Sequence, residues 1–108
     1  MSPTLNKVRE NVDAGRVRVS EHAFQELHDD TIDLQDIVSG LATATTVEDY
    51  PDYWKGPSVL CLQRDAENKL IHVLWGLSKQ APEIAIIITA YKPDPERWSD
   101  NFMTRKRK

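Results

Sequence analysis

A chain of 108 residues with 40% hydrophobic and 29% charged side chains predicts one folded domain with a modest core and excludes a disordered chain. No apolar run approaches the ~20 residues of a membrane helix, and the polar N-terminus lacks a signal-peptide apolar region, so we expect a cytoplasmic protein without a membrane partner. The single cysteine, Cys61, excludes an internal disulfide framework.

The charge is distributed unevenly along the chain. The net charge is −3, and residues 105–108 (RKRK) carry +4, so residues 1–104 sum to −7. We therefore predict a single domain over 1–104 and a basic tail at 105–108, which either touches nucleic acid or only aids solubility. Between Glu21 and Asp52 there are nine acidic residues and no Lys or Arg, a stretch that repels a phosphate backbone.

Apolar spacing and N-cap residues predict three helices in the first forty residues. Apolar side chains recur at helical spacing over 4–14, and a short strand follows at 16–20. Ser20 is the predicted N-cap of a second helix that ends near residue 30. Asp33, with an acid three residues later, is the predicted N-cap of a third helix that ends near residue 41.

The remainder of the domain predicts β-strands at 43–50, 58–64, 70–77 and 84–91. Short connections between the last three strands favour an antiparallel meander. Pro93 ends the last strand, and Asp94 begins a short helical turn through Trp98. The predicted fold is α+β, with N-terminal helices packed on one face of an antiparallel sheet of four to five strands.

Alternation along the last two strands predicts which side chains face the helices. The apolar sets expected beneath the helices are Ile71, Val73, Trp75 and Leu77 in 70–77, and Ile84, Ile86 and Ile88 in 84–91. If Leu77 pairs with Ile84, His72 stands opposite Thr89, and Tyr91 is diagonal to it. We therefore predict that His72, Thr89 and Tyr91 share the open face of the sheet.

Four segments resemble an uncharacterised bacterial family, the domain-of-unknown-function family numbered 4258. The segments are SEHAFQEL, TIDLQDIVSGL, LIHVLWGL and ITAYKPDPERW, and the resemblance covers about residues 16–98. The family pattern is Ser-x-His-Ala opening a helix, a second helix, a strand with His-Val, and a last strand ending Tyr-x-Pro-Asp-Pro-x-x-Trp. This chain departs from it at Asp30-Thr31-Ile32, where the family often has Arg-Gly-Ile.

The family is distantly similar to the RelE and MqsR toxins, which are mRNA interferases. The resemblance implies a RelE-like fold and a toxin component of a toxin–antitoxin system that cleaves mRNA without a metal. It also implies a small antitoxin partner of the zinc-finger type. Whether the chain forms a dimer is left open.

RNA cleavage of this kind needs groups that move protons and cations that stabilise the phosphorane. On this implied activity, His72 is the candidate acid or base, Tyr91 orients or donates a proton, and Arg64 clamps phosphate. Lys92 and Arg97 are candidate substrate-binding cations at the same end of the sheet. For each of these residues an ordinary packing or surface role is the alternative.

Two further residues are candidate substrate contacts. His22, in the first turn of its helix, either binds an anion or fixes the helix against the sheet. Trp54 lies in an aromatic loop that either stacks on bases or covers the end of the core. His22, His72 and Cys61 are a conceivable metal set, but we expect neither a metal nor another cofactor, because the chain has no metal-binding spacing and no Gly-rich phosphate loop.

Two rival functions remain open from the sequence. One is a non-catalytic protein-binding module, in which Trp54, Trp98 and Tyr91 anchor an interface. The other is a small hydrolase of a nucleotide or another phosphoester that uses the same residues as the ribonuclease.

Overall fold

The computed structural model describes residues 2–106, which form three α-helices, one 3-10 turn and five strands. The α+β class predicted from the sequence is confirmed. The helices are α1 (Pro3–Asp13), α2 (Glu21–Asp29) and α3 (Leu34–Gly40), followed by the 3-10 turn η1 (Leu41–Thr43). The strands are β1 (Val17–Val19), β2 (Thr45–Tyr50), β3 (Ser58–Arg64), β4 (Leu70–Leu77) and β5 (Ala85–Tyr91).

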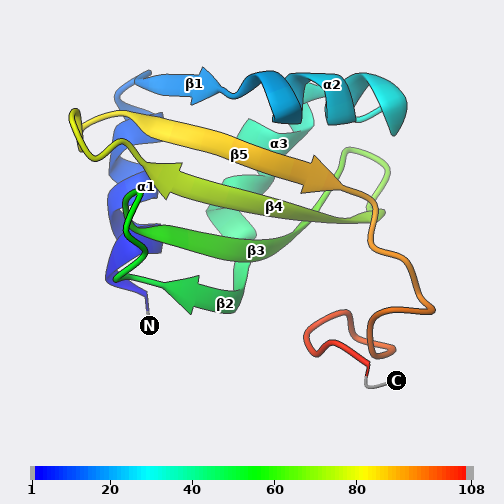
Figure 1. Ribbon diagram of the computed structural model, residues 1–108. Helices are drawn as coiled ribbons and strands as arrows, with labels where there is room; N and C mark the ends of the chain where they lie inside the picture. Colours follow the sequence, from blue (N-terminus) through cyan, green and yellow to red (C-terminus); the bar gives the residue numbers. More distant parts are fainter. Residues whose placement is uncertain (1, 107–108) are drawn as a thin grey trace.

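The five strands form one sheet in the order β1-β5-β4-β3-β2 (Figure 1). Strands β2 to β5 are the predicted antiparallel meander. The prediction of a wholly antiparallel sheet is wrong at one edge, because β1 pairs with β5 in parallel. The helix α1 and a short turn carry the chain to that edge, where the Arg16 carbonyl accepts a bond from the Ala85 N–H at 2.9 Å.

Local capping explains where the helices begin. The Ser2 hydroxyl accepts a bond from the Leu5 N–H at 3.1 Å, and Pro3 occupies a first-turn position that needs no N–H. The predicted caps of the other two helices are confirmed: Ser20 accepts from the α2 backbone, and Asp33 accepts from the α3 backbone.

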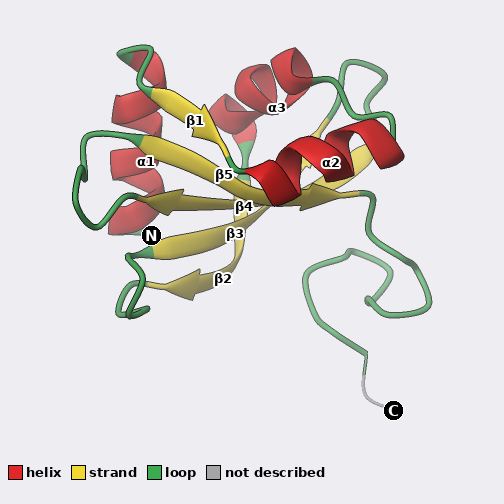
Figure 2. Ribbon diagram, turned by 45° about the horizontal axis from the view of Figure 1, so that its top comes forward, coloured by secondary structure: helices red, strands yellow, loops and turns green. Residues whose placement is uncertain are grey.

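The core lies between the sheet and the helices. Figures 1 and 2 show α1 and α3 against one face of the sheet, while α2 continues the line of β1 along the edge of β5. The fully buried sheet residues on this side include Val59, Cys61, Ile71, Val73, Trp75, Ala85 and Ile87. One buried polar pair sits among them, with the Trp75 indole donating to Gln63 Oε1 at 2.8 Å.

The predicted register of the last two strands is wrong. Leu77 pairs with Ala85 rather than with residue 84, and the register shifts near Ile88, where β5 has one residue more than its partner. Ala85 and Ile87 before the bulge and Ala90 after it are therefore the buried residues of this strand, while Ile86 and Ile88 are only partly buried. Beyond the bulge, His72 pairs directly with Tyr91, and the predicted partner Thr89 pairs with Leu74.

Residues 92–106, here called the C-terminal segment, leave the end of β5 and curl back on themselves (Figure 1). As predicted, Asp94 caps a single turn that ends at Trp98: its carbonyl accepts from the Arg97 and Trp98 N–H groups, and its side chain accepts from the Glu96 N–H. Trp98 then forms a β-bridge with Arg105. The segment covers part of the sheet face that the helices leave open. Leu60 and His72 on that face, and Trp98 above it, are buried outside the main core cluster.

Candidate functional site

His72 on β4 is enclosed by Tyr91 and the C-terminal segment. Its Nδ1 lies 3.2 Å from the Tyr91 hydroxyl, and its Nε2 lies 2.9 Å from the Phe102 carbonyl oxygen. A carbonyl only accepts, so Nε2 carries the proton, and Nδ1 of the neutral ring accepts from Tyr91. The Trp98 ring meets the imidazole edge to face, with the centroids 4.4 Å apart.

Burial sets the protonation of this pair. It lowers the pKa of His72, and the Arg105 guanidinium lowers it further, against the opposing effect of the Phe102 carbonyl. Burial also raises the pKa of Tyr91. At neutral pH the site therefore holds an uncharged imidazole with a basic nitrogen and a protonated phenol beside it.

Arg105 ties the C-terminal segment to β2. Its Nη2 lies 3.0 Å from Glu48 Oε1, and its guanidinium carbon lies 4.7 Å from the Trp98 ring centroid. The bond from Arg105 lowers the pKa of Glu48, and burial raises the pKa of Tyr50, whose hydroxyl also donates to Glu48. This chain of contacts places a cation next to His72 through Trp98.

A second polar cluster lies where α2 meets the edge of β5. Glu26 accepts bonds from the Thr89 hydroxyl and from the Ala90 N–H, and its Oε1 lies 3.3 Å from His22 Nε2. The His22 side chain is 72% exposed. His22 therefore belongs to an accessible imidazole–carboxylate pair on the helix, separate from the His72 pair.

The other predicted site residues are dispersed. Arg64 is exposed and donates to the Asn68 carbonyl of its own hairpin at 3.1 Å. Lys92 is exposed and donates its backbone N–H to Asp30, and Arg97 is exposed and faces Asp94 at 3.9 Å. Trp54 is 69% exposed beyond the end of β4 that lies away from His72. Among the seven predicted site residues, only His72 and Tyr91 are in direct contact with each other.

The proposed metal set is not assembled. Cys61 faces the helix side of the sheet, and His72 faces the other side. Burial raises the pKa of the Cys61 thiol to about 12, so it stays protonated at neutral pH. Among residues 2–106 there is no group of three or more His, Cys, Asp or Glu side chains with the spacing to hold a metal ion.

Sequence reasoning missed three residues that shape these clusters: Glu26, Glu48 and Arg105. The spacing of His22 and Glu26 by four residues on a helix is the one signal that was visible. Arg105 was assigned to a tail, and its pairing with Glu48 joins residues 57 positions apart, which no local pattern reveals.

The fold and the sites define a small α+β protein with a histidine–tyrosine pair on its sheet. Within the described residues, no helix combines the length and the apolar character that crossing a membrane requires. The profile of the family described as "Domain of unknown function (DUF4258)" matches residues 19–92, more than half of the chain. The chain belongs to this family. No curated protein and no solved structure matched it.

Proposed function

We propose that this protein is a toxin-type endoribonuclease whose proton-transfer groups are His72 and Tyr91. The observation that carries the proposal is the 3.2 Å contact between His72 Nδ1 and the Tyr91 hydroxyl, on the sheet face away from the helices. When a 2′-hydroxyl attacks the adjacent phosphate, one group must accept its proton and another must protonate the leaving oxygen. A neutral imidazole and a phenol supply these two roles without a metal.

In this proposal His72 is the base and Tyr91 the acid. The lowered pKa of His72 keeps Nδ1 unprotonated at neutral pH, and the hydroxyl beside it has a proton to give. Arg105 provides positive charge for the RNA backbone when a phosphate replaces Glu48 as its partner. Lys92 and Arg97 are exposed cations of the same segment and serve as backbone contacts.

RNA reaches His72 only when the C-terminal segment lifts, because the imidazole is fully buried. The side-chain contacts that hold the segment over the site are the His72–Phe102 bond, the Trp98 ring and the Arg105–Glu48 ion pair. The Arg105 side chain is 60% exposed and that of Glu48 is 32% exposed, and ion pairs with such access to solvent contribute little to stability. Phosphate groups compete with Glu48 for Arg105, so binding of RNA favours opening.

The partner in this proposal is a small antitoxin, of the zinc-finger type that the family resemblance implies, and both act in the cytoplasm. The chain belongs to the family, and the family's distant similarity to RelE-type toxins, on which this partner rests, is part of the proposal. The acids from Glu21 to Asp36 lie on and around α2 and α3, whereas Glu48 of the same block lies on β2 and pairs with Arg105 beside the His72 face.

Primer extension on an mRNA under translation in a bacterial extract tests the activity. The wild type, His72→Gln and Tyr91→Phe are compared at equal concentration. Gln keeps a donor for the Phe102 carbonyl but cannot act as a base, and Phe keeps the ring of Tyr91. Tyr53→Phe is the control, since it removes a hydroxyl from an exposed tyrosine of the β2–β3 loop.

New cleavage ends with the wild type and Tyr53→Phe, and a loss of at least about 100-fold with the two site variants, support the proposal. Equal cleavage by all four proteins would contradict the roles of His72 and Tyr91 but would support the endoribonuclease activity. Absence of new cleavage ends with the wild type at every protein concentration would contradict the proposed endoribonuclease activity.

A non-catalytic binding module is the second candidate, because both ring nitrogens of His72 are already bonded within the protein. In that role His72 fastens the C-terminal segment. Trp54, 69% exposed beside Tyr53, remains a candidate anchor, whereas Trp98 is buried and Tyr91 is half-buried. Failure of cleavage together with loss of partner binding in Trp54→Ala favours this reading.

A further inference from the structure

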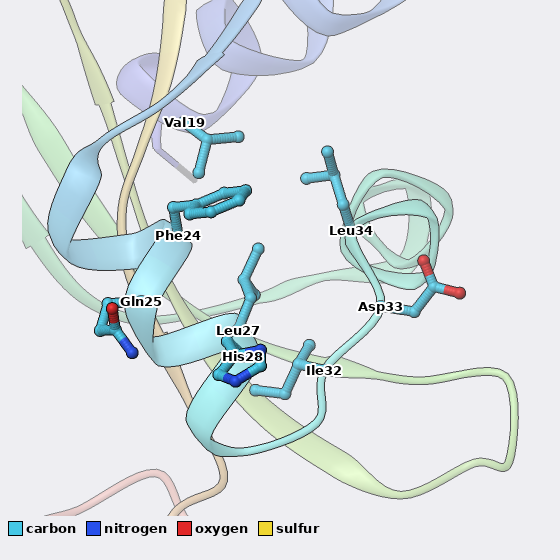
Figure 3. A pocket seen from close by; sticks show the side chains of 8 residues that line it. All are labelled: Val19, Phe24, Gln25, Leu27, His28, Ile32, Asp33 and Leu34. Carbon is cyan, nitrogen blue, oxygen red and sulfur yellow. The ribbon is translucent and has the colours of Figure 1, made fainter.

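An apolar groove lies between α2 and α3, on the side of the molecule that the proposed RNA site does not use (Figure 3). Its volume is about 540 Å³. Leu27 and Ile32 form its floor and are nearly buried. Phe24 and Leu34 line it as well, and these two are 70% and 41% exposed.

Phe24 is the most exposed of the large hydrophobic residues that the structure places on its surface. Its ring stands at the groove beside Val19, and Leu34 stands at the start of α3 across the opening (Figure 3). Single exposed apolar residues are ordinary in folded proteins. Here Phe24 and Leu34 flank a concave apolar floor and form one continuous apolar patch with it. Such a patch gains free energy when another apolar surface removes it from water.

The charge around the groove selects the kind of partner. Asp33 lines the groove together with Gln25 and His28, and α2 carries further acids at Glu21 and Asp29. No Lys or Arg occurs from residue 21 to residue 52. The rim is therefore negative, so it repels RNA, DNA and anionic lipid surfaces and attracts Lys and Arg side chains.

We infer that this groove binds a basic amphipathic helix of a partner protein. Apolar side chains one helical turn apart on the partner fill the space between Phe24 and Leu34, and the flanking Lys and Arg residues face the acids of α2 and α3. The inference rests on the groove and its charge, and it does not depend on RNA cleavage.

A synthetic peptide tests the inference on the intact chain. The probe is a helix of about 16 residues with Leu along one face and Lys elsewhere, and its counterpart has Glu in place of every Lys. Both are titrated into ¹⁵N-labelled protein, and amide shifts locate the contact. The variants are Phe24→Asp and, as the matched control, Trp54→Asp, because Trp54 is 69% exposed and lies outside the groove.

We expect the Lys peptide to shift amides of α2 and α3, and the Glu peptide to shift none. We expect Phe24→Asp to weaken binding at least about tenfold and Trp54→Asp to leave it unchanged, with affinity falling as salt rises. Shifts elsewhere, equal binding by both peptides, or no binding at about 1 mM peptide would overturn the inference. Self-association that Phe24→Asp abolishes would also overturn it, by making a second copy the occupant.

Discussion

At the scale of the residue, two buried polar side chains on the sheet, Gln63 and His72, each bond to partners distant in the sequence. Gln63 is buried on β3, where its amide donates to the Ile37 carbonyl at 2.8 Å and accepts from the Trp75 indole at 2.8 Å. His72, on the other face, uses both ring nitrogens in the same way. Sequence alone placed His72 and Tyr91 on one face, but it assigned no function to Gln63, because its partners are 26 and 12 residues away.

Replacing Gln63 by Leu is expected to destabilise the fold by roughly 2–4 kcal/mol. The change leaves a buried indole N–H and a buried carbonyl without partners, and each costs about 1–3 kcal/mol when unsatisfied. Urea unfolding followed by tryptophan fluorescence measures the loss. Gln35→Leu, on the exposed surface of α3, is the control and should lie within about 0.5 kcal/mol of the wild type. Equal stability of the two variants would contradict the expectation.

His72 is expected to make the protein less stable as pH falls below about 6.5. Its folded-state pKa is lowered from 6.5 by burial, so the unfolded chain binds a proton that the folded chain refuses. The stabilising effect is complete above 6.5 and is lost as pH falls through the folded-state pKa. The measurement is the free energy of unfolding between about pH 5 and 7.

In His72→Gln the slope of stability against pH in that range should fall by up to about one proton. His28→Gln, which replaces an exposed histidine on α2, is the matched control for the loss of a histidine. The loss of stability below this pH range has another source. The hydrogen bond from Arg105 lowers the pKa of Glu48 from 4.5, so protonation of Glu48 also destabilises the fold. The same slope in both variants would show that His72 is not the titrating group.

At the scale of the element, the starts of the helices were predicted better than the pairing between strands. Ser20 and Asp33 begin their helices as expected, because an N-cap is a local signal. The register of β5 was mispredicted, since the extra residue at Ile88 reverses the faces and bulges leave no clear sequence mark. Gly76 accommodates this bulge: a Cβ there would lie 2.5 Å from the Ile88 side chain. The short strand at 16–20 was predicted, but its parallel pairing with β5 was not, because three residues carry too little pattern to specify a partner.

Beyond the end of β1, side chains of α2 take over the pairing of the β5 edge. The Ser20 hydroxyl donates to the Ile88 carbonyl, Glu26 accepts from the Ala90 N–H at 3.1 Å, and Asp30 accepts from the Lys92 N–H at 3.0 Å. This arrangement satisfies an edge that would otherwise offer free N–H groups to another strand. It also fixes the residues on either side of Tyr91.

Glu26→Ala is expected to loosen this edge and to destabilise the protein by about 1–2 kcal/mol. The variant removes the acceptor of both the Thr89 hydroxyl and the Ala90 N–H. Amide hydrogen exchange, measured by NMR, should be faster at Ala90 and unchanged at Val73 in the sheet interior. The control is Glu21→Ala, an exposed acid in the first turn of the same helix. Unchanged exchange at Ala90 would mean that Glu26 does not hold the edge.

At the scale of the whole molecule, the sheet separates two surfaces of different character. The α2–α3 side carries the apolar groove and the acids of these two helices, whereas the opposite side carries His72, Tyr91 and the cations of the C-terminal segment, with Glu48 paired to Arg105. The two proposed partners, a basic protein helix and RNA, thus approach different sides. The family profile ends at residue 92, where the C-terminal segment begins, so the cover over His72 lies outside the matched region.

Trp98→Ala is expected to release that cover. Trp98 is buried against His72 and lies beneath Arg105, so its loss removes the apolar contact that holds the segment on the sheet. Diethyl pyrocarbonate, which modifies accessible neutral imidazoles, should label His22 and His28 in the wild type, because both are exposed, and leave buried His72 unlabelled. In Trp98→Ala, His72 should be labelled too, as peptide mass spectrometry will show.

Trp54→Ala removes an equally large but exposed ring and should keep the wild-type labelling, which separates release of the segment from a general effect of losing a tryptophan. The labelling must be compared where circular dichroism shows both variants folded. If His72 stays protected in folded Trp98→Ala, the segment is held by the Phe102 carbonyl and the Arg105–Glu48 pair rather than by the indole. If His72 is labelled in the wild type as well, the segment already opens in solution, and RNA needs no further trigger to reach the histidine.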